Sequence, residues 1–306
     1  MSTKTERLLR PYEDELHLRY TGTTIVSHLS HLRGFLRWLS ARGLELTEVK
    51  REDVQAYQNE LHTFRRRDGR AFSLGFHLNR LSAVRTLFGF LSKRGLILHN
   101  PAAGIELPRQ EKHLPRTLLT PAEARRILET AAKAKTAFNL RDRAILETFY
   151  ATGIRANELS KLRPYDVDTE ARVLRVAMGK GKKDRHVPLT RQAARAIESY
   201  LVKGRTKLPS KQKAPYLFVA SRGGFLHDAV LNRLIRSYAK KAGIRKHITC
   251  HTFRHSVATH LLKGRADIRH IQALLGHASL NTTQLYTRVE ISDLKDVLRR
   301  AHPRGR

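Results

Sequence analysis

The amino-acid sequence predicts a mostly α protein, with a helical N-terminal domain and an α-rich second domain that contains one small antiparallel β-sheet. Two observations lead to this fold class. In several segments apolar residues recur at steps of three and four, which places them on one face of a helix. Only the segments 171–178 (ARVLRVAM) and 185–189 (RHVPL) read as strands, and the turn-rich stretch GKGKKD separates them as in a hairpin.

Two long helices are expected in the first hundred residues, over 23–42 and 76–94. Each has an apolar stripe, and their ends are alike, LSARGLEL and LSKRGLIL. Gly43 and Gly95 supply the stops, because glycine readily adopts the left-handed conformation that closes a helix. A shorter helix is expected in TEVKREDVQAYQNELH, and a basic loop at 65–70 (RRRDGR). Two local matches are too few to indicate a repeat array.

A change in amino-acid composition marks the domain boundary. The stretch NPAAGIELPRQEKHLPRTLLTPAEA has four prolines and little periodicity, which is typical of a linker. A helix start follows, with Thr120 as the cap, a proline at the first helical position and Glu123 completing a capping box. We therefore expect a first domain of residues 1–107, a linker of 108–118 and a second domain of 119–306.

The second domain is expected to be largely helical around its hairpin. Its predicted helices lie in NLRDRAILETFYATGI, after Thr190, at about 228–241, at 251–263, and from 291 to the end of the chain.

The charge of the chain indicates a polyanionic partner. Among 306 residues, 59 lysines and arginines face 27 acidic residues, a net charge of +32. Nucleic acid is the obvious candidate, because each neutralised phosphate releases a counterion and strengthens binding. No stretch approaches the roughly 20 apolar residues of a spanning helix, the N-terminus lacks a signal-like apolar region, and the single cysteine, Cys250, excludes an intrachain disulfide and a multi-cysteine zinc site. We expect a soluble intracellular protein that binds DNA or RNA.

The segment CHTFRHSVATHLLKG contains a candidate anion site. His251 and Arg254 are three residues apart, so they share a helical face, and the planar fork of arginine matches phosphate oxygens. A metal site at His251, His255 and His260 is disfavoured, because there is no nearby carboxylate and no HExxH pattern. An ordinary solvated face remains an alternative for this segment. Catalysis by the Cys250 thiol is disfavoured, because a single cysteine is more often a small buried apolar residue.

A second candidate lies in YATGIRANELSKL, where Arg155 follows a glycine-containing turn and Glu158 is three residues further on. Alone, this spacing favours a surface ion pair. The functional alternative is a buried arginine that Glu158 steadies while its other donors face an anion.

Basic residues of two loops are candidate DNA contacts. GKGKKDRH lacks the spacing of a phosphate-binding loop and lies between strands, so a nucleotide site is rejected. A hairpin tip with three lysines instead suits a DNA groove or backbone, and Lys180, next to the strand end, is best placed to be held rigidly. The expected DNA contacts are Lys182, Lys183, Arg185, Arg65, Arg66 and Arg67.

Tyr286, in LLGHASLNTTQLYTRVE, is either an anchor with its ring in the core or a nucleophile. Cleaving a phosphodiester without a metal needs a nucleophile, fixed positive charge and an acid for the leaving oxygen. A covalently attached tyrosine also conserves the bond energy for resealing. The order of two arginines, a hairpin lysine, spaced histidines and then a tyrosine favours the nucleophile.

With these residues in hand, the sequence resembles the tyrosine site-specific recombinases of the phage integrase family, and most closely their two-domain Xer-like members. ATGIRANEL resembles the first arginine box, GKGKKDRHVPL the hairpin with the catalytic lysine, HTFRHSVATHLL the His-x-x-Arg box, and IQALLGHASLNTTQLYTRV the final box. The six family positions that these boxes match are Arg155, Lys180, His251, Arg254, His277 and Tyr286. The helical N-terminal half is similar to the family's core-binding domain.

The resemblance implies a role for each residue. Tyr286 would attack the scissile phosphate and form a 3′-phosphotyrosyl link. Arg155 and Arg254 would neutralise its non-bridging oxygens, and Lys180 would protonate the leaving oxygen. The remaining roles are proton transfer for His251, a hydrogen bond to the phosphate for His277 and orientation of Arg155 for Glu158. No metal and no cofactor are implied.

The resemblance also implies the partners. The protein would close two domains around double-stranded DNA with inverted-repeat sites, in the bacterial cytoplasm with the nucleoid and away from membranes. It would act as a homo-tetramer, or with a related recombinase, on two sites. The apolar stripe of the tail, Leu294, Val297 and Leu298, would dock either on a neighbouring protomer or on its own domain. A type IB-like topoisomerase and a non-catalytic DNA-binding protein remain alternatives.

Overall fold

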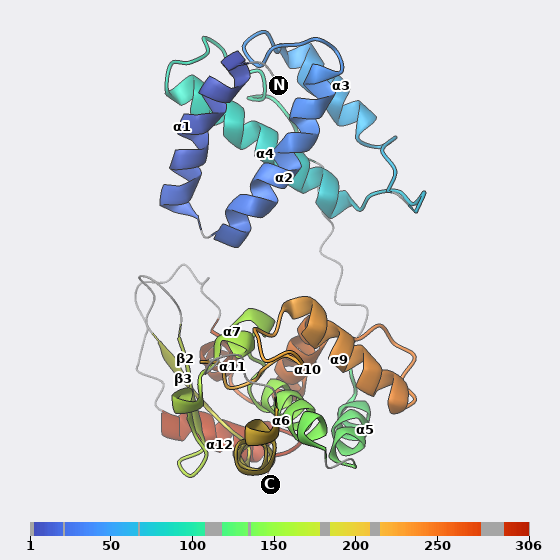
Figure 1. Cartoon of the computed structure of the whole chain (residues 1–306), viewed down its shortest axis with the longest axis vertical. Coiled ribbons are helices and arrows are strands. Elements are labelled where there is room, and N and C mark those ends of the chain that lie inside the picture. The colour runs from blue at the N-terminus through green and yellow to red at the C-terminus, as the bar shows by residue number, and fades with distance from the viewer. Residues whose placement is uncertain are drawn as a thin grey trace. The chain divides into compact units, whose positions relative to one another are not determined.

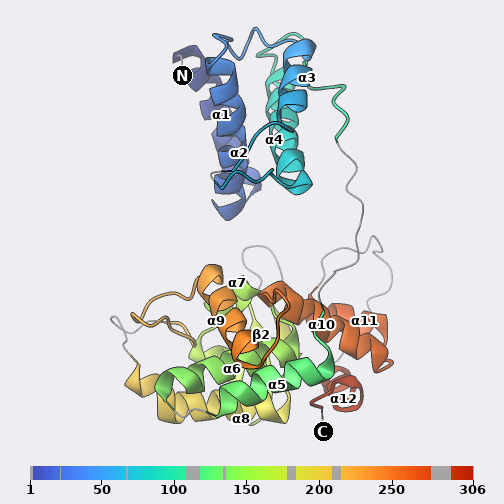
Figure 2. The same ribbon diagram turned by 90° about the vertical axis from the view of Figure 1, so that its right-hand side faces the viewer.

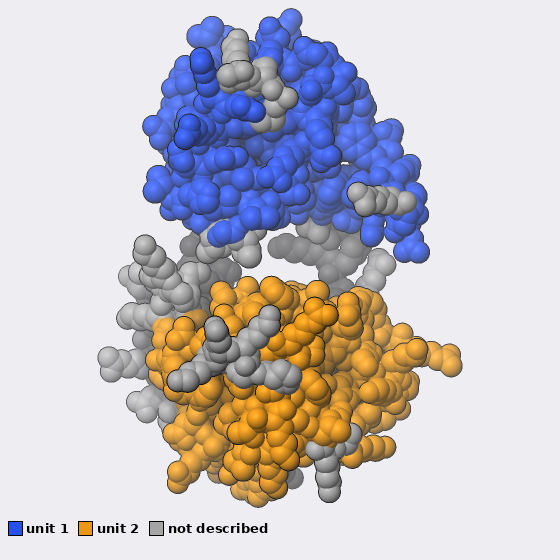
Figure 3. Space-filling view, viewed as in Figure 1, with its two compact units in different colours: residues 1–113 blue, residues 114–306 orange. Residues whose placement is uncertain are grey.

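The computed structural model of the chain describes residues 3–20, 22–66, 68–107, 118–133, 136–177, 184–208, 215–276 and 291–305. It divides into two compact units, residues 1–113 and 114–306 (Figure 3). Almost all of the predicted linker, 108–118, lies outside the described residues. No described helix is long and apolar enough to cross a membrane.

Unit 1 is helical, as the sequence predicts. Its described helices are α1 (Thr3–Arg19), α2 (Gly22–Ser40), α3 (Arg51–Glu60) and α4 (Leu74–Lys93). Helix α2 packs against α4, and α1 contacts both (Figure 1). The buried aromatic rings of Phe35, Tyr57 and Phe88 meet edge to face at the centre of this unit. Such pairs add to the stabilisation that burial alone gives.

Helices α2 and α4 end in the same way, as their similar sequences predict. Gly43 and Gly95 have φ values of 65° and 66°. Beyond them, the amide of Leu44 donates to the carbonyl of Leu39 at 3.1 Å, and that of Leu96 donates to the carbonyl of Leu91 at 2.9 Å. Both helices thus close with the hydrogen bond of a Schellman motif.

Unit 2 is built around a buried helix, α6 (Ala137–Thr152), which contacts α5 (Pro121–Ala132), α8 (Arg191–Ser199) and α10 (Cys250–Lys263) (Figure 2). The predicted capping box of α5 is confirmed. The amide of Glu123 donates to Thr120 Oγ1 at 3.1 Å, and the amide of Thr120 donates to Glu123 Oε2 at 2.8 Å. These bonds fix the first turn of the unit.

One antiparallel sheet has the order β1-β2-β3. The predicted hairpin strands are shorter than expected, β2 (Val173–Val176) and β3 (Arg185–Pro188), with Val173 opposite Pro188 and Val176 opposite Arg185. A further strand, β1 (Val167–Asp168), follows a 3₁₀ turn (Pro164–Asp166) and was not predicted. Two residues are too few to show the alternation of a strand.

The remaining described elements are α7 (Ala156–Lys161), a π turn (Tyr200–Gly204), a 3₁₀ turn (Arg205–Lys207), α9 (Asp228–Lys241), α11 (Ile268–Leu275) and α12 (Ile291–Ala301). The bounds predicted for α9 are confirmed.

Helix α12 packs on its own unit, against α10 and β3 (Figure 1). Its predicted stripe, Leu294, Val297 and Leu298, is buried. The approach is close, because a Cβ atom at Gly264 would collide with the backbone of Ala301. The mostly α fold class with a small antiparallel sheet is confirmed.

Candidate active site

Arg155 is positioned by the turn between α6 and α7. Gly153 caps α6 in the left-handed conformation, φ 60°, and Ile154 is buried. Arg155 then begins α7 as its N-cap residue, where its backbone amide donates to Glu158 Oε2 at 3.0 Å. A Cβ atom at residue 153 would lie 2.5 Å from Leu275, so only glycine allows this approach between the turn and α11.

The Arg155 side chain is held by two partners. Its Nη1 donates to Glu158 Oε1 at 2.9 Å, and its Nη2 donates to the carbonyl of Gly276 at 3.0 Å. The Arg155 side chain is 39% exposed, whereas that of Glu158 is 13% exposed. Glu158 therefore holds Arg155, as the functional alternative predicted. That alternative also predicted a buried arginine, whereas the Arg155 side chain is half-buried and accessible to a ligand.

Arg254 lies deeper, on α10. Its Nη1 donates to the carbonyl of Gly153 at 2.7 Å, and its Nη2 donates to the carbonyl of Leu275 at 2.9 Å. Burial lowers the pKa of its guanidinium to about 10, and the neighbouring charge of Arg155 acts in the same direction. The solvated-face alternative is wrong for this residue, because Arg254 is buried.

The two arginines thus converge on one place. They bind adjacent carbonyls, those of Leu275 and Gly276, at the end of α11. Like charges brought together at a partly buried site repel each other, and an anion between them would relieve that repulsion. The end of α11 is therefore a candidate anion site.

Glu158 is the acidic member of this site. Arg185 meets it with two hydrogen bonds, Nη1 to Oε1 at 3.0 Å and Nη2 to Oε2 at 2.7 Å. Burial would raise the pKa of this carboxyl, but the hydrogen bonds from Arg185 and Arg155 outweigh burial and bring its pKa to about 2. Glu158 is therefore ionised at neutral pH, and with the two arginines of the site and Arg185 the cluster keeps an excess of positive charge.

His251 lies in the first turn of α10 and is exposed, unlike the buried Arg254 three residues later. Burial lowers the pKa of the nearby His255, and the charge of His251 adds to that shift. Within the described part of the chain, no group of three or more histidine, cysteine or acidic side chains could hold a metal ion.

Several predicted site residues lie outside the described residues. These are Lys180, Lys182, Lys183, His277, Tyr286 and Arg67. The structure describes the final box as far as Gly276, the residue directly before His277. Helix α11 ends at Leu275, and Gly276 takes the left-handed conformation with φ 67°. The carbonyl of Gly276 accepts the hydrogen bond of Arg155.

Three contributors to the site were not predicted from the sequence: the carbonyls of Gly153, Leu275 and Gly276. A backbone carbonyl leaves no signal in the sequence, although Gly153 belongs to the glycine-containing turn that was expected before Arg155. The partnership of Arg185 with Glu158 was also not predicted, because it joins residues 27 apart through the hairpin. Arg185 was expected to contact DNA, but the structure places it inside the ion cluster, with 13% of its side chain exposed.

Of the predicted DNA contacts in unit 1, Arg65 and Arg66 are described. Both lie in a small exposed loop, in which Arg65 pairs with Ala71 as an isolated antiparallel bridge and the amide of Arg66 donates to the carbonyl of Arg70 at 2.9 Å. Among the described residues, Arg66 forms a long ion pair with Asp68, 3.7 Å between Nη2 and Oδ2, and its side chain is 55% exposed. Its charge is therefore available to a phosphate.

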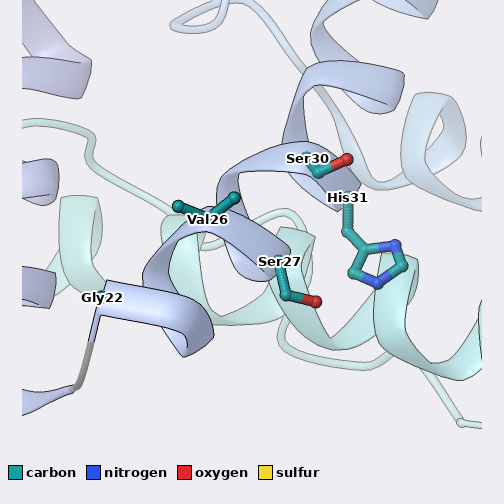
Figure 4. Close-up of a pocket in the computed structure, with 5 residues that line it drawn as sticks. All are labelled: Gly22, Val26, Ser27, Ser30 and His31. Carbon is teal, nitrogen blue, oxygen red and sulfur yellow. The ribbon is translucent and has the colours of Figure 1, made fainter. Parts of the chain in front are cut away.

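Two surface hollows lie apart from the arginine site. One, of about 450 Å³, is on α2 and is lined by Gly22, Val26, Ser27, Ser30 and His31 (Figure 4). Its described lining residues include no arginine and no carboxylate. The other, of about 620 Å³, adjoins the end of α9 and is lined by Arg236, Lys240, Gly243, Ile244, Arg245, Lys246 and His247.

The chain matches known families along most of its length. Residues 117–292 match the phage integrase family, and residues 12–95 match the phage integrase N-terminal SAM-like domain. It is 38% identical to tyrosine recombinase XerC 2 of Ralstonia nicotianae, over 95% of this chain and 84% of that protein. It is 37% identical to tyrosine recombinase XerD of Chlorobaculum tepidum, over 95% of this chain and 93% of that protein.

The fold is also found among solved structures. The crystal structure of the XerH site-specific recombinase bound to difH substrate matches with a TM-score of 0.68 and 24% identity, covering 90% of this chain and 80% of that one. The chain therefore belongs to the phage integrase family of tyrosine recombinases, Xer-like enzymes that cleave and rejoin DNA in site-specific recombination.

Proposed function

We propose that Tyr286 is the nucleophile of this recombinase and that the arginine site at the end of α11 binds the scissile phosphate. The observation that carries the proposal is the convergence of Arg155 and Arg254 on the adjacent carbonyls of Leu275 and Gly276. The chain continues from there to His277 and, nine residues later, to Tyr286. A phosphate held by the two arginines would thus lie next to the segment that bears the tyrosine.

In the proposed reaction, the Tyr286 oxygen attacks phosphorus and a tyrosyl–phosphate bond forms at the 3′ side of the break. The bond from phosphorus to the 5′ oxygen breaks, and Lys180 gives that oxygen a proton. Arg155 and Arg254 offset the negative charge that grows on the non-bridging oxygens, a stabilisation that is strongest in a partly dehydrated site. His251 assists proton transfer by accepting the proton that the Tyr286 hydroxyl loses, His277 hydrogen-bonds the phosphate, and Glu158 orients Arg155.

Rejoining is the reverse step with a different 5′ hydroxyl. That hydroxyl attacks phosphorus, and the tyrosine leaves with its proton restored. The phosphotyrosyl link holds the energy of the broken bond, so no nucleotide is consumed. Exchange of the 5′ ends between two cleaved sites would convert cleavage into recombination.

We further propose that the two units bind one duplex together, with residues 1–107 as a core-binding domain, 108–118 as the linker and 119–306 as the catalytic domain. The substrate would carry inverted-repeat sites, and a homo-tetramer, or a mixed assembly with a related recombinase, would hold two sites. The net charge of +32 supports such extensive phosphate contact. Acting on DNA, the protein would work in the cytoplasm with the nucleoid.

The test is a covalent-trap assay with a nicked duplex that carries a candidate inverted-repeat site, in buffer with a metal chelator. The wild-type protein should form a DNA adduct that resists denaturant and disappears on protease digestion, and Tyr286→Phe should form none. Specific binding without an adduct would favour a non-catalytic DNA-binding protein.

A second substrate separates recombination from topoisomerase activity. A supercoiled plasmid with two sites should yield recombinant circles. A plasmid that becomes relaxed but yields no recombinant circles, wherever the cleavage takes place, would favour the topoisomerase alternative.

A further inference from the structure

Arg185, the first residue of β3, lies against Glu158 of α7 in a two-pronged ion pair. The guanidinium and the carboxylate face each other through two hydrogen bonds of 3.0 and 2.7 Å. Both side chains are only 13% exposed. Paired, planar contacts of this kind are the strongest that arginine makes with a carboxylate. Arg185 therefore lies inside the site, where its guanidinium binds Glu158.

Arg155 and Arg185 share both oxygens of Glu158. Oε1 accepts from Arg155 Nη1 at 2.9 Å and from Arg185 Nη1 at 3.0 Å. Oε2 accepts from the Arg155 backbone amide at 3.0 Å and from Arg185 Nη2 at 2.7 Å. Without Arg185, the full charge of the carboxylate would fall on Arg155. That pairing would draw the Arg155 guanidinium toward Glu158 and reduce its attraction for a phosphate.

Arg185 also packs on the turn at the end of α11. A Cβ atom at Gly276 would lie 2.8 to 2.9 Å from the Arg185 guanidinium, so the guanidinium lies directly over the Gly276 backbone. The carbonyl of the same glycine accepts the second hydrogen bond of Arg155. Arg185 thus touches both groups that hold Arg155, Glu158 and Gly276.

We propose that Arg185 is a positioning residue for DNA cleavage. It balances the charge of Glu158 and packs against the Gly276 turn. Arg155 therefore stays in place, with its charge directed at the scissile phosphate. This role rests on the proposed function of Arg155. It replaces the DNA contact that the sequence predicted for Arg185. Because Arg185 begins β3, it also ties the strand that follows the lysine hairpin to the arginine site.

The experiment separates cleavage from binding. The rate of adduct formation on a nicked duplex is measured in single turnover at saturating protein, and the Kd for DNA is measured as a function of salt. The variants are Arg185→Gln, Arg185→Lys and the charge-balanced pair Arg185→Gln with Glu158→Gln. The control is Arg175→Gln on β2, which removes another arginine–carboxylate ion pair, in which Nε and Nη2 both donate to Oδ1 of Asp166 in the 3₁₀ turn.

Arg185→Gln should slow cleavage about tenfold to a hundredfold, the usual effect of displacing a catalytic group by a fraction of an ångström to an ångström. The salt dependence of binding should stay that of the wild type. Arg185→Lys should not restore the rate, because an ammonium cannot make the two-pronged contact. The charge-balanced pair should cleave faster than Arg185→Gln alone, because no unbalanced carboxylate then competes for Arg155. Arg175→Gln should cleave at the wild-type rate.

A direct DNA contact gives the opposite pattern. Arg185→Gln would then lower the slope of log Kd against log salt by about one phosphate contact. Arg185→Lys would restore most of the affinity. Adding Glu158→Gln to Arg185→Gln would restore none of the loss. That result would overturn the proposal, as would wild-type cleavage by Arg185→Gln. A wild-type protein that forms no adduct would contradict the proposed function instead, so the two failures are distinguishable. The charge-balanced pair also guards against loss of folding, because it buries no unpaired charge.

Discussion

Arg254 donates a hydrogen bond of 2.9 Å to the carbonyl of Leu275, which ties α10 to the last residue of α11. The same guanidinium reaches the carbonyl of Gly153 at 2.7 Å, in the turn that presents Arg155. A single buried side chain therefore joins the two turns that form the candidate phosphate site. Its loss should affect both the stability of unit 2 and catalysis.

Arg254→Lys should lower the free energy of unfolding by about 1–3 kcal/mol, because one ammonium cannot span both carbonyls and a buried acceptor loses its partner. Adduct formation should fall by about a hundredfold to a thousandfold, as for other lost charge-stabilising donors. Urea unfolding and the nicked-duplex assay measure the two effects. Arg269→Lys is the control, because Arg269 forms an exposed ion pair with Asp267 and should show neither effect. A normal adduct yield from Arg254→Lys would contradict the assignment.

Gly276→Ala should reduce cleavage more than its cost in stability explains. The residue has φ 67°, and an added Cβ would press on the Arg185 guanidinium. Gly243→Ala is a matched control, with φ 73° at the end of α9 and no atom within 4 Å of the added Cβ. Both should lose about 1 kcal/mol in urea unfolding from the left-handed conformation alone. Only Gly276→Ala should slow adduct formation, and equal rates for the two variants would show that the contact with Arg185 is unimportant.

Unit 2 should lose stability as the pH falls from about 6.5 toward 4, through His302. This buried ring donates from Nε2 to the carbonyl of Tyr150 at 2.9 Å and accepts at Nδ1 from the Arg304 amide at 3.1 Å, so it is neutral. Burial, together with the charges of His260 and Arg304, lowers its pKa to about 4, although the hydrogen bond to the Tyr150 carbonyl acts in the opposite direction. The unfolded chain takes up a proton near pH 6.5 and the folded chain does not, so protonation favours unfolding by up to roughly 3 kcal/mol.

Urea unfolding followed by far-ultraviolet circular dichroism between pH 7.5 and 4.5 tests this dependence. His302→Gln should flatten the pH slope of the unfolding free energy. The residual slope includes His260, whose pKa burial also lowers. Trp38, the single tryptophan, lies in unit 1, so its fluorescence transition should not respond to His302→Gln. An unaltered slope in the circular dichroism transition would contradict a neutral, titrating His302.

Arg66→Gln should weaken binding to all DNA sequences alike. Its side chain is 55% exposed and its ion pair with Asp68 is long, so it is available to a phosphate. Loss of one such contact should reduce the slope of log Kd against log salt by about one. Arg299→Gln, which removes the same charge from an exposed position on α12, should leave the slope unchanged. Equal slopes for Arg66→Gln and the wild type would exclude a phosphate contact there.

Much of the helical framework followed from local signals in the sequence. The Thr120 capping box, the glycine stops and the bounds of α9 depend on residues within a turn or two of one another. The pairing of Arg185 with Glu158 could not be predicted, because it depends on how the hairpin folds back on α7. The burial of Arg254 was hidden for a related reason. Its acceptors are backbone carbonyls in turns that are far away in the sequence, and no side-chain pattern identifies a backbone carbonyl as an acceptor.

The most direct measurement is to identify the residue that carries the DNA. The wild-type adduct, formed on a nicked duplex with a label on the 3′ side of the break, would be digested with protease and nuclease and mapped by mass spectrometry. The account predicts a nucleotide linked through its 3′ phosphate to the peptide that contains Tyr286, and no such peptide from Tyr286→Phe. A nucleotide linked to another residue, or through a 5′ phosphate, would contradict it.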